Sequence, residues 1–513
     1  MTGLAAFESS IAEHYHEATK YSEEGLRRES SRHGPPDMTR RPSLVKTFDG
    51  PRVLLPTAGL PLQRRGPAAP VVAAAPAGSM DLAKLARVLW HTNGCTLLEQ
   101  HPWGFQHFRA APSAGAMYPT EVYVAVRGMP GLAPGVYDYQ VLDHSLALVR
   151  EGDVLPQLHG AAFGNPAVAA AEAVVLLTAE WFRSSWRYRE RGYRRALLDT
   201  GHVLGNVVAA APCEGFTAMP VASFRDEVIE KILGIEPATE GALAMAPLVA
   251  SSVAQGLPAI PQRKSDSTEW KLAMAAVGGR VDEGAPERII AALHLAGRLG
   301  QSAESVMPPP ARPTSDPDSP FVGAGAAPTS WSADEPVTST IAGRRSTRAF
   351  SGVPVRLDAL LRALAHAYPS PERSLFAPEI LRTYVVAMNV QGLEPGSYAY
   401  EISPRRLSER CPGELSAALH HLGLAQDIFT DAAAALIHTV DLTRAVERYG
   451  DRVYRLVSLD AGHVGERFNL ALLREGLGVS GCGGYYDDEM NRVLKIPESQ
   501  AVVYITAAGV PAS

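Results

Sequence analysis

The stretch YRRALLDTGH (residues 193–202) decides the fold, because the chain repeats it as YRLVSLDAGH (residues 454–463) at an offset of 261 residues. The same offset separates LAPGVYDY, which ends at Tyr139, from LEPGSYAY, which ends at Tyr400. A constant offset with matching Gly, Tyr, Asp and His indicates that one unit is present twice. Two copies are too few for a solenoid. They predict an internal pseudo-dimer, in which one chain supplies both halves of a two-fold assembly.

Each copy has the periodicity of an α/β unit. In the first copy, the spacing of apolar residues predicts helices at residues 81–92 and 193–215 and strands at 121–127 and 172–181. It also predicts a hairpin at residues 135–150. The second copy repeats this order, and Asp226 and Asp487 keep the offset of 261. We therefore expect each copy to fold as a domain.

The chain of 513 residues is longer than one hydrophobic core usually serves. We expect an N-terminal extension (1–50), a first domain (51–260), a linker (261–335) in which residues 284–300 could form a helix, and a second domain (336–513). Residues 302–335 are rich in Pro, Ser and Ala, a composition typical of linkers.

Composition and charge exclude several functional classes. The chain is 46% hydrophobic and 20% charged, which is ordinary for a globular protein. Its net charge of −6 gives no reason to expect a nucleic-acid partner. It has no apolar run of about 18 residues that would span a membrane, and its N-terminus lacks the pattern of a secretory signal. The four cysteines have no paired metal-ligand spacing, which predicts no metal site and favours a reduced, cytoplasmic protein.

The second copy opens with a basic cluster, GRRSTRAF, that the first copy lacks. The cluster contains Arg344, Arg345, Ser346 and Arg348 and directly precedes the helical stretch LDALLRALAHA. Guanidinium groups beside the start of a helix are suited to binding a phosphate. When LARVLWH is aligned with LLRALAH at an offset of 275, Arg345 corresponds to position 70, inside GPAAPVVAAAP, which has no arginine.

Two loops differ between the copies in opposite ways. Only the first copy has the small loop Pro112-Ser113-Ala114-Gly115, whereas the second has bulky charged residues there, Arg373 among them. Only the second copy has a glycine loop, with Gly481, Gly483 and Gly484 in GVSGCGGYYDDEM, where the first has Pro220, Ala222 and Ser223. Glycine allows the backbone to approach a ligand closely.

This complementary loss and retention favours one composite ligand site at the junction of the copies. Alone, each element has a plainer interpretation. An arginine cluster is more often a solvated surface, a GxGG tract is more often a turn, and a Pro-Ser-Ala-Gly tract is a simple loop. Together they predict that the second copy contributes the basic cluster and the glycine loop, and that the first contributes the small loop. The equivalent site across the pseudo-two-fold would have decayed.

Several motifs resemble those of the nitroreductase family. RRSTRAF resembles the flavin-phosphate motif that opens such domains. YHEATKYS (15–22), RAAPSAGAMYPTEVYVAV and GLAPGVYDYQVLDHSL resemble the SagB-type, thiazole- and oxazole-forming dehydrogenase branch, as do both copies of the YR…LD.GH stretch. The resemblance implies an α+β fold of two tandem nitroreductase-like domains, each a central antiparallel sheet flanked by helices, with FMN at the interface of the pseudo-dimer.

The resemblance also implies roles for the composite site. The basic cluster would hold the phosphate and ribityl end of FMN, and the Pro-Ser-Ala-Gly loop would line the ring. The glycine loop would place backbone N–H groups near the reactive edge, where they stabilise negative charge on reduced flavin. The cofactor-binding residues would be Arg344, Arg345, Ser346, Arg348, Pro112, Ser113, Ala114, Gly115, Gly481, Gly483 and Gly484.

Azoline-oxidising members of that branch carry a Lys-Tyr pair before the long helix, which is linked to proton removal. This chain has Arg187-Tyr188 in the first copy and Arg448-Tyr449 in the second. Arginine stays protonated, so it cannot be a general base. We expect one tyrosine to be the base, with its arginine lowering the tyrosine pKa. The sequence leaves open which copy supplies it, and an exposed pair at the start of a helix is the alternative.

Asp199 and His202 of the first copy recur as Asp460 and His463 in the second. Features kept in both copies, including the copy that lost its flavin elements, are more often structural than catalytic. We expect each Asp and His to form a buried hydrogen-bonding pair near the long helix.

The resemblance implies an FMN-dependent oxidoreductase of SagB type that dehydrogenates a peptide-derived heterocycle, azoline to azole, in natural-product biosynthesis. One alternative is an NAD(P)H-dependent nitroreductase-like flavin reductase. Another is a non-catalytic flavin-binding protein or an accessory subunit of a peptide-modifying complex. The expected partners are a peptide or peptide-like substrate and other biosynthetic proteins. The chain would act as a monomeric pseudo-dimer or as a higher homo-oligomer.

Overall fold

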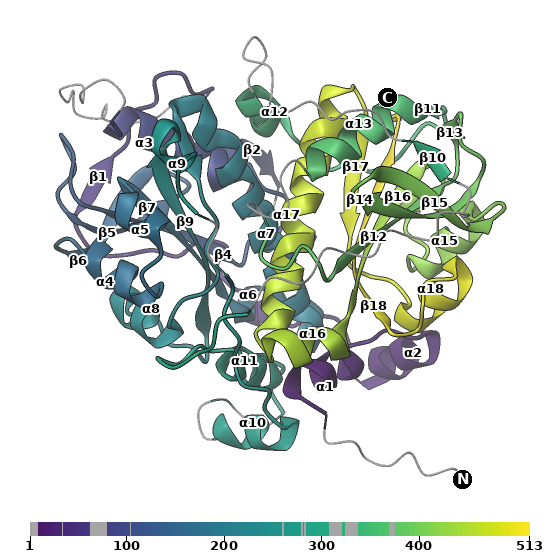
Figure 1. Cartoon of the computed structure of the whole chain (residues 1–513), viewed down its shortest axis with the longest axis horizontal. Coiled ribbons are helices and arrows are strands. Elements are labelled where there is room, and N and C mark those ends of the chain that lie inside the picture. The colour runs from purple at the N-terminus through teal and green to yellow at the C-terminus, as the bar shows by residue number, and fades with distance from the viewer. Residues whose placement is uncertain are drawn as a thin grey trace.

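The protein consists of two domains of the same architecture, placed side by side (Figure 1). This computed structural model describes residues 9–32, 34–61, 79–102, 104–258, 261–278, 281, 284–306, 321–323, 337–368 and 375–512. Each domain has a seven-stranded sheet in which neighbouring strands run antiparallel. The fold is therefore α+β, as the resemblance implied. The periodicity of each copy had indicated an α/β unit, and this prediction was wrong because the strands of each sheet run antiparallel.

The two sheets have equivalent strand orders, β1-β6-β5-β4-β7-β9-β8 and β10-β15-β14-β12-β16-β18-β17. The first sheet contains β1 (Arg52–Leu54), β4 (Thr120–Val126), β5 (Gly135–Gln140), β6 (Ser145–Glu151), β7 (Ala173–Glu180), β8 (Phe216–Ala218) and β9 (Glu240–Ala250). The second contains β10 (Phe321–Gly323), β12 (Leu381–Ala387), β14 (Gly396–Ile402), β15 (Arg405–Pro412), β16 (Ala434–Asp441), β17 (Gly478–Cys482) and β18 (Gln500–Gly509). The duplication in the sequence is thus a duplication of a whole domain.

Helices cover both faces of each sheet, which explains why the central strands are apolar throughout. In β4, Val122 and Val124 pack in the core shared with α3 (Leu82–Asn93) and α7 (Gly192–Ala210). Tyr123 and Ala125 face the opposite core. That core is closed by α4 (Leu155–Ala161), α5 (Pro166–Ala170) and α8 (Asp226–Leu233). In the second domain, the corresponding helices are α13 (Leu357–Ala367) and α17 (Val453–Arg474), and α15 (Ser416–Leu422) and α18 (Asp487–Leu494).

The long helices α7 and α17 form the centre of the interface (Figure 1). They approach so closely that a Cβ on Gly201 would lie 2.3 Å from the carbonyl oxygen of Leu459. A Cβ on Gly462 would lie 2.2 Å from the carbonyl oxygen of Leu198. These contacts exchange under the offset of 261, so a pseudo-two-fold axis passes between the two glycines. One apolar core runs through both domains across this crossing.

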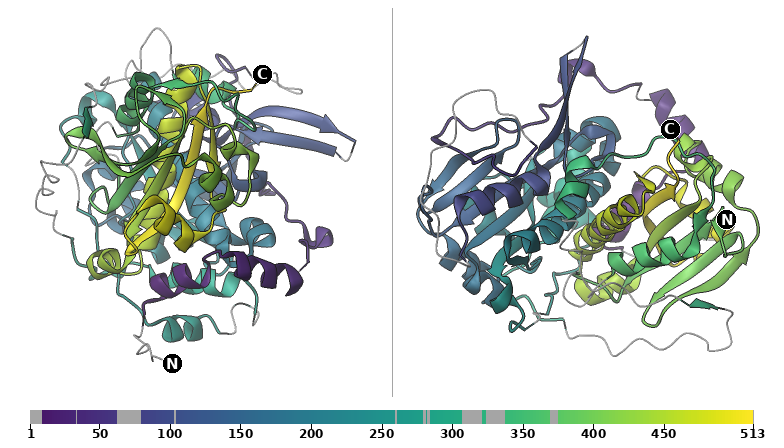
Figure 2. Two further views of the ribbon diagram at one scale, coloured as in Figure 1. Left: turned by 90° about the vertical axis from the view of Figure 1, so that its right-hand side faces the viewer. Right: turned by 90° about the horizontal axis from the view of Figure 1, so that it is seen from above.

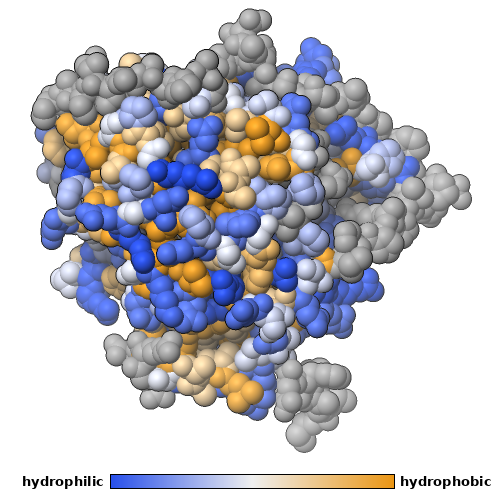
Figure 3. All heavy atoms as spheres, turned by 60° about the vertical axis from the view of Figure 1, so that its left-hand side comes forward, coloured by the Kyte–Doolittle hydropathy of each residue, from blue (hydrophilic) through white to orange (hydrophobic). Residues whose placement is uncertain are grey.

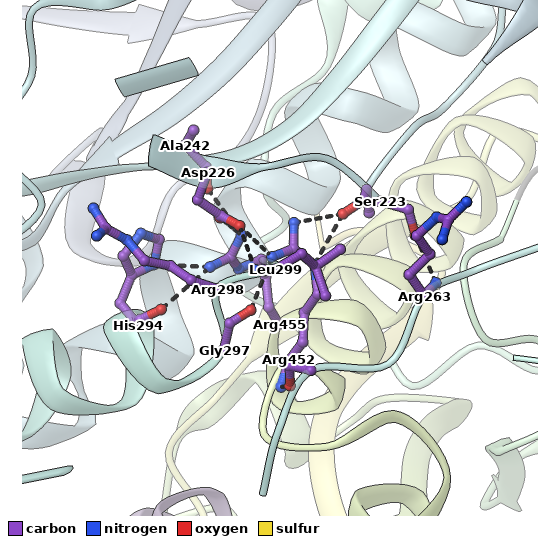
Figure 4. Close-up of polar contacts among 12 residues, drawn as sticks. Ser223, Asp226, Ala242, Arg263, His294, Gly297, Arg298, Leu299, Arg452 and Arg455 are labelled. Carbon is purple, nitrogen blue, oxygen red and sulfur yellow. Dashed lines mark hydrogen bonds and ion pairs between the residues drawn. The ribbon is translucent and has the colours of Figure 1, made fainter. Parts of the chain in front are cut away.

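Two buried ion clusters, also related by the pseudo-two-fold, join the domains. Asp226 lies 2.7 Å from Arg452 and 2.6 Å from Arg455 (Figure 4). Asp487 lies 2.8 Å from each of its partners, Arg191 and Arg194. In each cluster, the two arginines hold the pKa of the carboxyl well below its usual range, against the opposing effect of burial. The repeated aspartates of the sequence are therefore cross-domain anchors.

The N-terminal helix α1 (Ile11–Ala18) and the linker helix α11 (Glu287–Ala296) are also equivalent. The backbone N–H of Tyr21, just after α1, donates to Asp487 at 2.8 Å. The N–H of Leu299, just after α11, donates to Asp226 at 3.1 Å. The predicted linker helix thus exists, and it is the second copy of the N-terminal helix. Each repeated unit therefore begins with a helix, α1 or α11, that lies outside the expected domain bounds of 51–260 and 336–513.

A hairpin of β2 (Cys95–His101) and β3 (Gly104–Arg109) distinguishes the first domain, and it projects from the body in both views of Figure 2. The offset falls from 275 at α3 to 261 at β4, so the first copy is 14 residues longer here. Position 70 and Arg373, used in the comparison of the copies, lie outside the described residues.

The remaining elements lie around the two domains. They are α2 (Glu23–Arg32), α6 (Trp181–Tyr188), α9 (Ser251–Ala254), α10 (Trp270–Ala276), α12 (Val337–Gly343), α16 (Leu442–Tyr449) and the short strands β11 (Val355–Arg356) and β13 (Val390–Gln391). The face shown in Figure 3 carries hydrophilic residues interspersed with smaller hydrophobic areas. Among the helices of the described segments, none combines the length and apolar character needed to cross a membrane.

Candidate active site

A cavity of about 780 Å³ lies at the junction of the two domains. The first domain contributes residues from the hairpin, the loop before β4 and the helices α6 and α7. The second contributes the segment after α12, the strand β17 with the loop that follows it, and β18. All eleven residues predicted to bind the cofactor line this cavity. The sequence had placed them in three separate segments, and the pseudo-dimer brings them together.

The basic cluster forms one wall. Arg345 donates from Nη1 to the Arg344 carbonyl oxygen at 2.6 Å and to Thr96 Oγ1 in the hairpin at 3.2 Å. Arg344 is buried, and its Nε donates to the Ala110 carbonyl oxygen at 2.7 Å. None of Arg344, Arg345 and Arg348 forms an ion pair with a residue that the structure describes. Arg344 thus fixes the base of the first-domain hairpin, and the wall carries positive charge without a protein counter-ion.

The Pro-Ser-Ala-Gly loop is held by Asp199 of α7. Ser113 Oγ donates to Asp199 at 2.5 Å, and the backbone N–H of Ala114 donates to it at 3.1 Å. Burial raises the pKa of Asp199 to about 6, although both of these hydrogen bonds act in the opposite direction. In the second copy, Asp460 accepts from the backbone N–H groups of Phe376 and Ala377, both at 2.8 Å. Each aspartate therefore fixes the loop of its own domain, and only the first of these loops lines the cavity.

The expected Asp–His pairs do not form. His202 Nδ1 lies 2.8 Å from Glu466 Oε2, and its Nε2 lies 2.8 Å from the Tyr504 hydroxyl. His463 has no hydrogen-bond partner among the described residues. The expectation that these groups are buried was correct, but the pairing was wrong because each aspartate faces a loop instead.

The glycine loop lies against side chains that leave no room for a Cβ. A Cβ on Gly481 would lie 1.9 Å from the Tyr504 hydroxyl, and one on Gly483 would lie 1.4 Å from Arg195 Nη1. A side chain at either position would have to displace Tyr504 or Arg195. Glycine therefore lets these two side chains pack against the loop that lines the cavity.

The structure separates the two Arg-Tyr pairs. Tyr188 lines the cavity, and its hydroxyl would lie 2.6 Å from a Cβ on Gly115. Arg187 lies against the same glycine, at 3.1 Å from that position, but does not itself line the cavity. Tyr449 and Arg448 lie elsewhere, where both contact Glu379.

The pKa of Tyr188 is raised above its ordinary value of 10 because the phenol is buried, although Arg195 and Arg187 both favour the phenolate. The pKa of Tyr449 is also raised, by burial and by Glu379. The neighbouring arginine thus acts on the tyrosine pKa in the expected direction, but the net pKa is raised because the cost of burying the charged form outweighs the attraction.

Sequence reasoning missed several residues that line the cavity. Arg195, Asn469 and Tyr504 line it, and the positions equivalent to them in the other copy are Leu456, Val208 and Ala244. A polar side chain in one copy opposite an apolar one in the other was a usable signal, since the same asymmetry had revealed the loops. Further lining residues that the sequence did not predict include Tyr21, Leu26, Gln106, Phe108, Leu424 and Gln426.

The equivalent location across the pseudo-two-fold is occupied by the chain itself. Ser223, which corresponds to Gly484, accepts a hydrogen bond from the backbone N–H of Arg263 at 2.9 Å (Figure 4). The backbone N–H of Ser265 donates to the Tyr449 carbonyl oxygen at 3.0 Å. Residues 262–265 therefore lie against the counterparts of the glycine loop and of Tyr188.

Comparison with known proteins gives matches over both domains. The model of the nitroreductase family matches residues 76–248 and 341–510. A crystal structure from Anabaena variabilis, provisionally assigned as a nitroreductase, is 34% identical and has a TM-score of 0.84. That alignment covers 98% of this chain and all of the other.

Two similar proteins are named for the processing of trifolitoxin and of microcin B17. The trifolitoxin-processing protein TfxB of Rhizobium leguminosarum is 33% identical over 153 residues, which are 27% of this chain and 39% of TfxB. The microcin B17-processing protein McbC of Escherichia coli is 28% identical over 151 residues, which are 28% of this chain and 52% of McbC. The chain thus spans about half or less of the length of these two relatives.

Proposed function

Because this chain belongs to the nitroreductase family, we propose that it is an FMN-dependent oxidoreductase of SagB type that converts a peptide-derived azoline to an azole. The observation that carries the proposal is the composition of one cavity. Arginines without a protein counter-ion, a glycine loop without room for side chains and a small loop from the other domain all line it.

The residues present fit FMN. Arg345, Arg348 and Ser346 offer charge-assisted hydrogen bonds to a phosphate, and a flat ring suits a wall of backbone at Gly481 and Gly483. Bound FMN would supply the acceptor for the two electrons that leave the substrate as a hydride. The chain itself would supply the base for the proton, Tyr188, with Arg187 beside it.

Similarity to TfxB and McbC supports a peptide substrate, since both of those proteins are named for processing a peptide product. The direct test is anaerobic mixing of the flavin-loaded protein with a synthetic thiazoline-containing peptide and, separately, with NADPH. Bleaching of the flavin absorbance by the peptide, with the corresponding thiazole as product, is the expected result. Bleaching by NADPH alone would instead indicate a flavin reductase, and no bleaching by either would favour a non-catalytic role.

We expect one FMN per chain. Within the described part of the chain, one of the two pseudo-equivalent locations forms the cavity with the basic cluster, and residues 262–265 lie against the other. Flavin released by denaturation, measured by absorbance against protein concentration, should give a ratio near one. A ratio near two would refute the composite site.

Arg345→Ala should weaken FMN binding by about tenfold to a hundredfold, since a charge-assisted hydrogen bond contributes about 1.5–3 kcal/mol. The dissociation constant is measured by fluorescence quenching as FMN is added to the apoprotein. Arg356→Ala is the matched control, because Arg356 lies in the same domain but pairs with Asp358 at the surface. Equal losses in both variants would mean that the basic cluster does not hold the phosphate.

A further inference from the structure

Arg195 is a buried arginine without a protein partner. Its side chain extends from α7 into the cavity, and the residue is only 5% exposed. Arg195 forms no hydrogen bond or ion pair with any described residue, and its Nε is buried and unsatisfied. A guanidinium has five donors and keeps its charge, and burying such a group without an acceptor is costly. Asp199 attracts the guanidinium from nearby, but no described residue accepts a hydrogen bond from it, so its donors are available to an anionic group of a ligand.

The position of the guanidinium is closely defined by its neighbours. Its Nη1 would lie 1.4 Å from a Cβ on Gly483, and its Nη2 would lie 3.8 Å from one on Gly484. Its central carbon lies 5.1 Å from the centroid of the Tyr188 ring. Arg195 thus lies between the glycine loop and the tyrosine that lines the cavity, which is where we place the reacting atoms.

The fold itself does not require this arginine. Arg191 and Arg194, on the same helix, bind Asp487 and join the domains, and both recur in the second copy as Arg452 and Arg455. Arg195 is replaced there by Leu456, and Gly483 corresponds to Ala222. Arg195 of the first copy and Gly483 of the second meet at the cavity, whereas the equivalent pair at the other location is Leu456 and Ala222.

We infer that Arg195 binds an oxygen of the substrate, either a carboxylate or the carbonyl oxygen that gains negative charge as the neighbouring carbon loses its proton. This inference rests on the proposed function and specifies the substrate further: it carries an acyl or carboxylate group beside the ring that is oxidised. A cation fixed at this point would stabilise charge that develops on that oxygen. Proximity to Tyr188 favours a substrate oxygen over the cofactor as the bound group.

The test measures binding of benzoate, a simple carboxylate, to the flavin-loaded protein by titration calorimetry, with benzyl alcohol as the neutral probe. Arg195→Leu, which introduces the residue type found at position 456, should weaken benzoate binding about tenfold to a hundredfold. It should leave benzyl alcohol binding and flavin content unchanged. Arg195→Lys, which keeps the charge but loses the planar fork, should give an intermediate loss. Arg448→Leu, at the tyrosine of the other copy, should have no effect.

Absence of benzoate binding in the wild type, or unchanged affinity in Arg195→Leu, would overturn the inference. A lower flavin midpoint potential in Arg195→Leu, with unchanged benzoate affinity, would assign the arginine to the reduced cofactor instead. If Arg195→Leu does not fold, the Arg195→Lys titration decides, and wild-type benzoate affinity in that variant, which lacks the planar guanidinium, overturns the inference. These results are separate from the proposed function, which fails if the purified protein binds no FMN.

Discussion

Tyr188→Phe is expected to slow flavin reduction by a thiazoline-containing peptide about 10²–10⁴-fold, the usual contribution of general acid–base catalysis. Tyr188 is the tyrosine of the two Arg-Tyr pairs that lines the cavity, and its hydroxyl lies against Gly115. The substitution removes the group that can take a proton but keeps the ring on which Arg195 lies. Anaerobic stopped-flow absorbance measures the rate, and FMN content should stay at the wild-type level.

The pH dependence of this rate tests the assigned role. Burial raises the pKa of Tyr188 above 10, so the phenol is protonated at neutral pH and only a small fraction can accept a proton. The ionised fraction of Tyr188 grows about tenfold for each pH unit below its pKa. If this ionisation limits the step, the rate grows in the same proportion. We therefore expect the wild-type rate to rise from pH 7 towards pH 10 and the rate of Tyr188→Phe to stay low throughout.

Tyr449→Phe is the matched control. Tyr449 is the equivalent residue of the second copy, but it contacts Glu379 and does not line the cavity. Its loss should leave the rate of flavin reduction unchanged. Equal effects of the two substitutions, or no effect of either, would show that the base lies elsewhere.

Asp226→Asn is expected to lower the free energy of unfolding by about 3–5 kcal/mol, the usual cost of removing one member of a buried ion pair. The substitution leaves Arg452 and Arg455 buried without a counter-charge at the interface of the domains (Figure 4). Urea unfolding followed by circular dichroism measures the change. Asp487→Asn should destabilise similarly and also reduce FMN retention, since Arg191 donates to the Gly483 carbonyl oxygen at 3.3 Å.

The pH dependence of stability has a definite sign. The pKa of Asp226 is lower in the folded protein than its unfolded value of about 3.9. Its contribution is therefore fully present above about pH 4 and is lost as the pH falls towards the folded pKa. The difference between wild type and Asp226→Asn should be constant from pH 7 to 5 and should shrink below pH 4.

Asp358→Asn is the control for that series. Asp358 also pairs with two arginines, Arg356 and Arg362, and they lower its pKa to about 2. This cluster is exposed, so water and salt screen it, and its loss should leave the urea midpoint unchanged. A midpoint for Asp226→Asn equal to that of wild type would mean that the buried cluster contributes no net stability.

The duplication, the two-domain organisation and eleven of the residues that line the cavity could be predicted from the sequence. These followed from comparison of the copies, because a basic cluster or glycine loop kept in only one copy differs visibly at a constant offset. The long helices and central strands also followed, since their apolar periodicity is local. The same comparison could have revealed Arg195 and Tyr504, whose counterparts are Leu456 and Ala244.

Only the tertiary structure decided which of the equivalent residues face the cavity. Tyr188 and Tyr449 occupy equivalent positions after an arginine, yet only Tyr188 lines the cavity with the glycine loop, since Ser265 lies against Tyr449 at the equivalent location. The partners of Asp199 and His202, and the equivalence of α1 and α11, likewise depend on contacts between residues far apart in the chain. The direction of the Tyr188 pKa shift depended on burial, a property of the packed pseudo-dimer that no local pattern encodes.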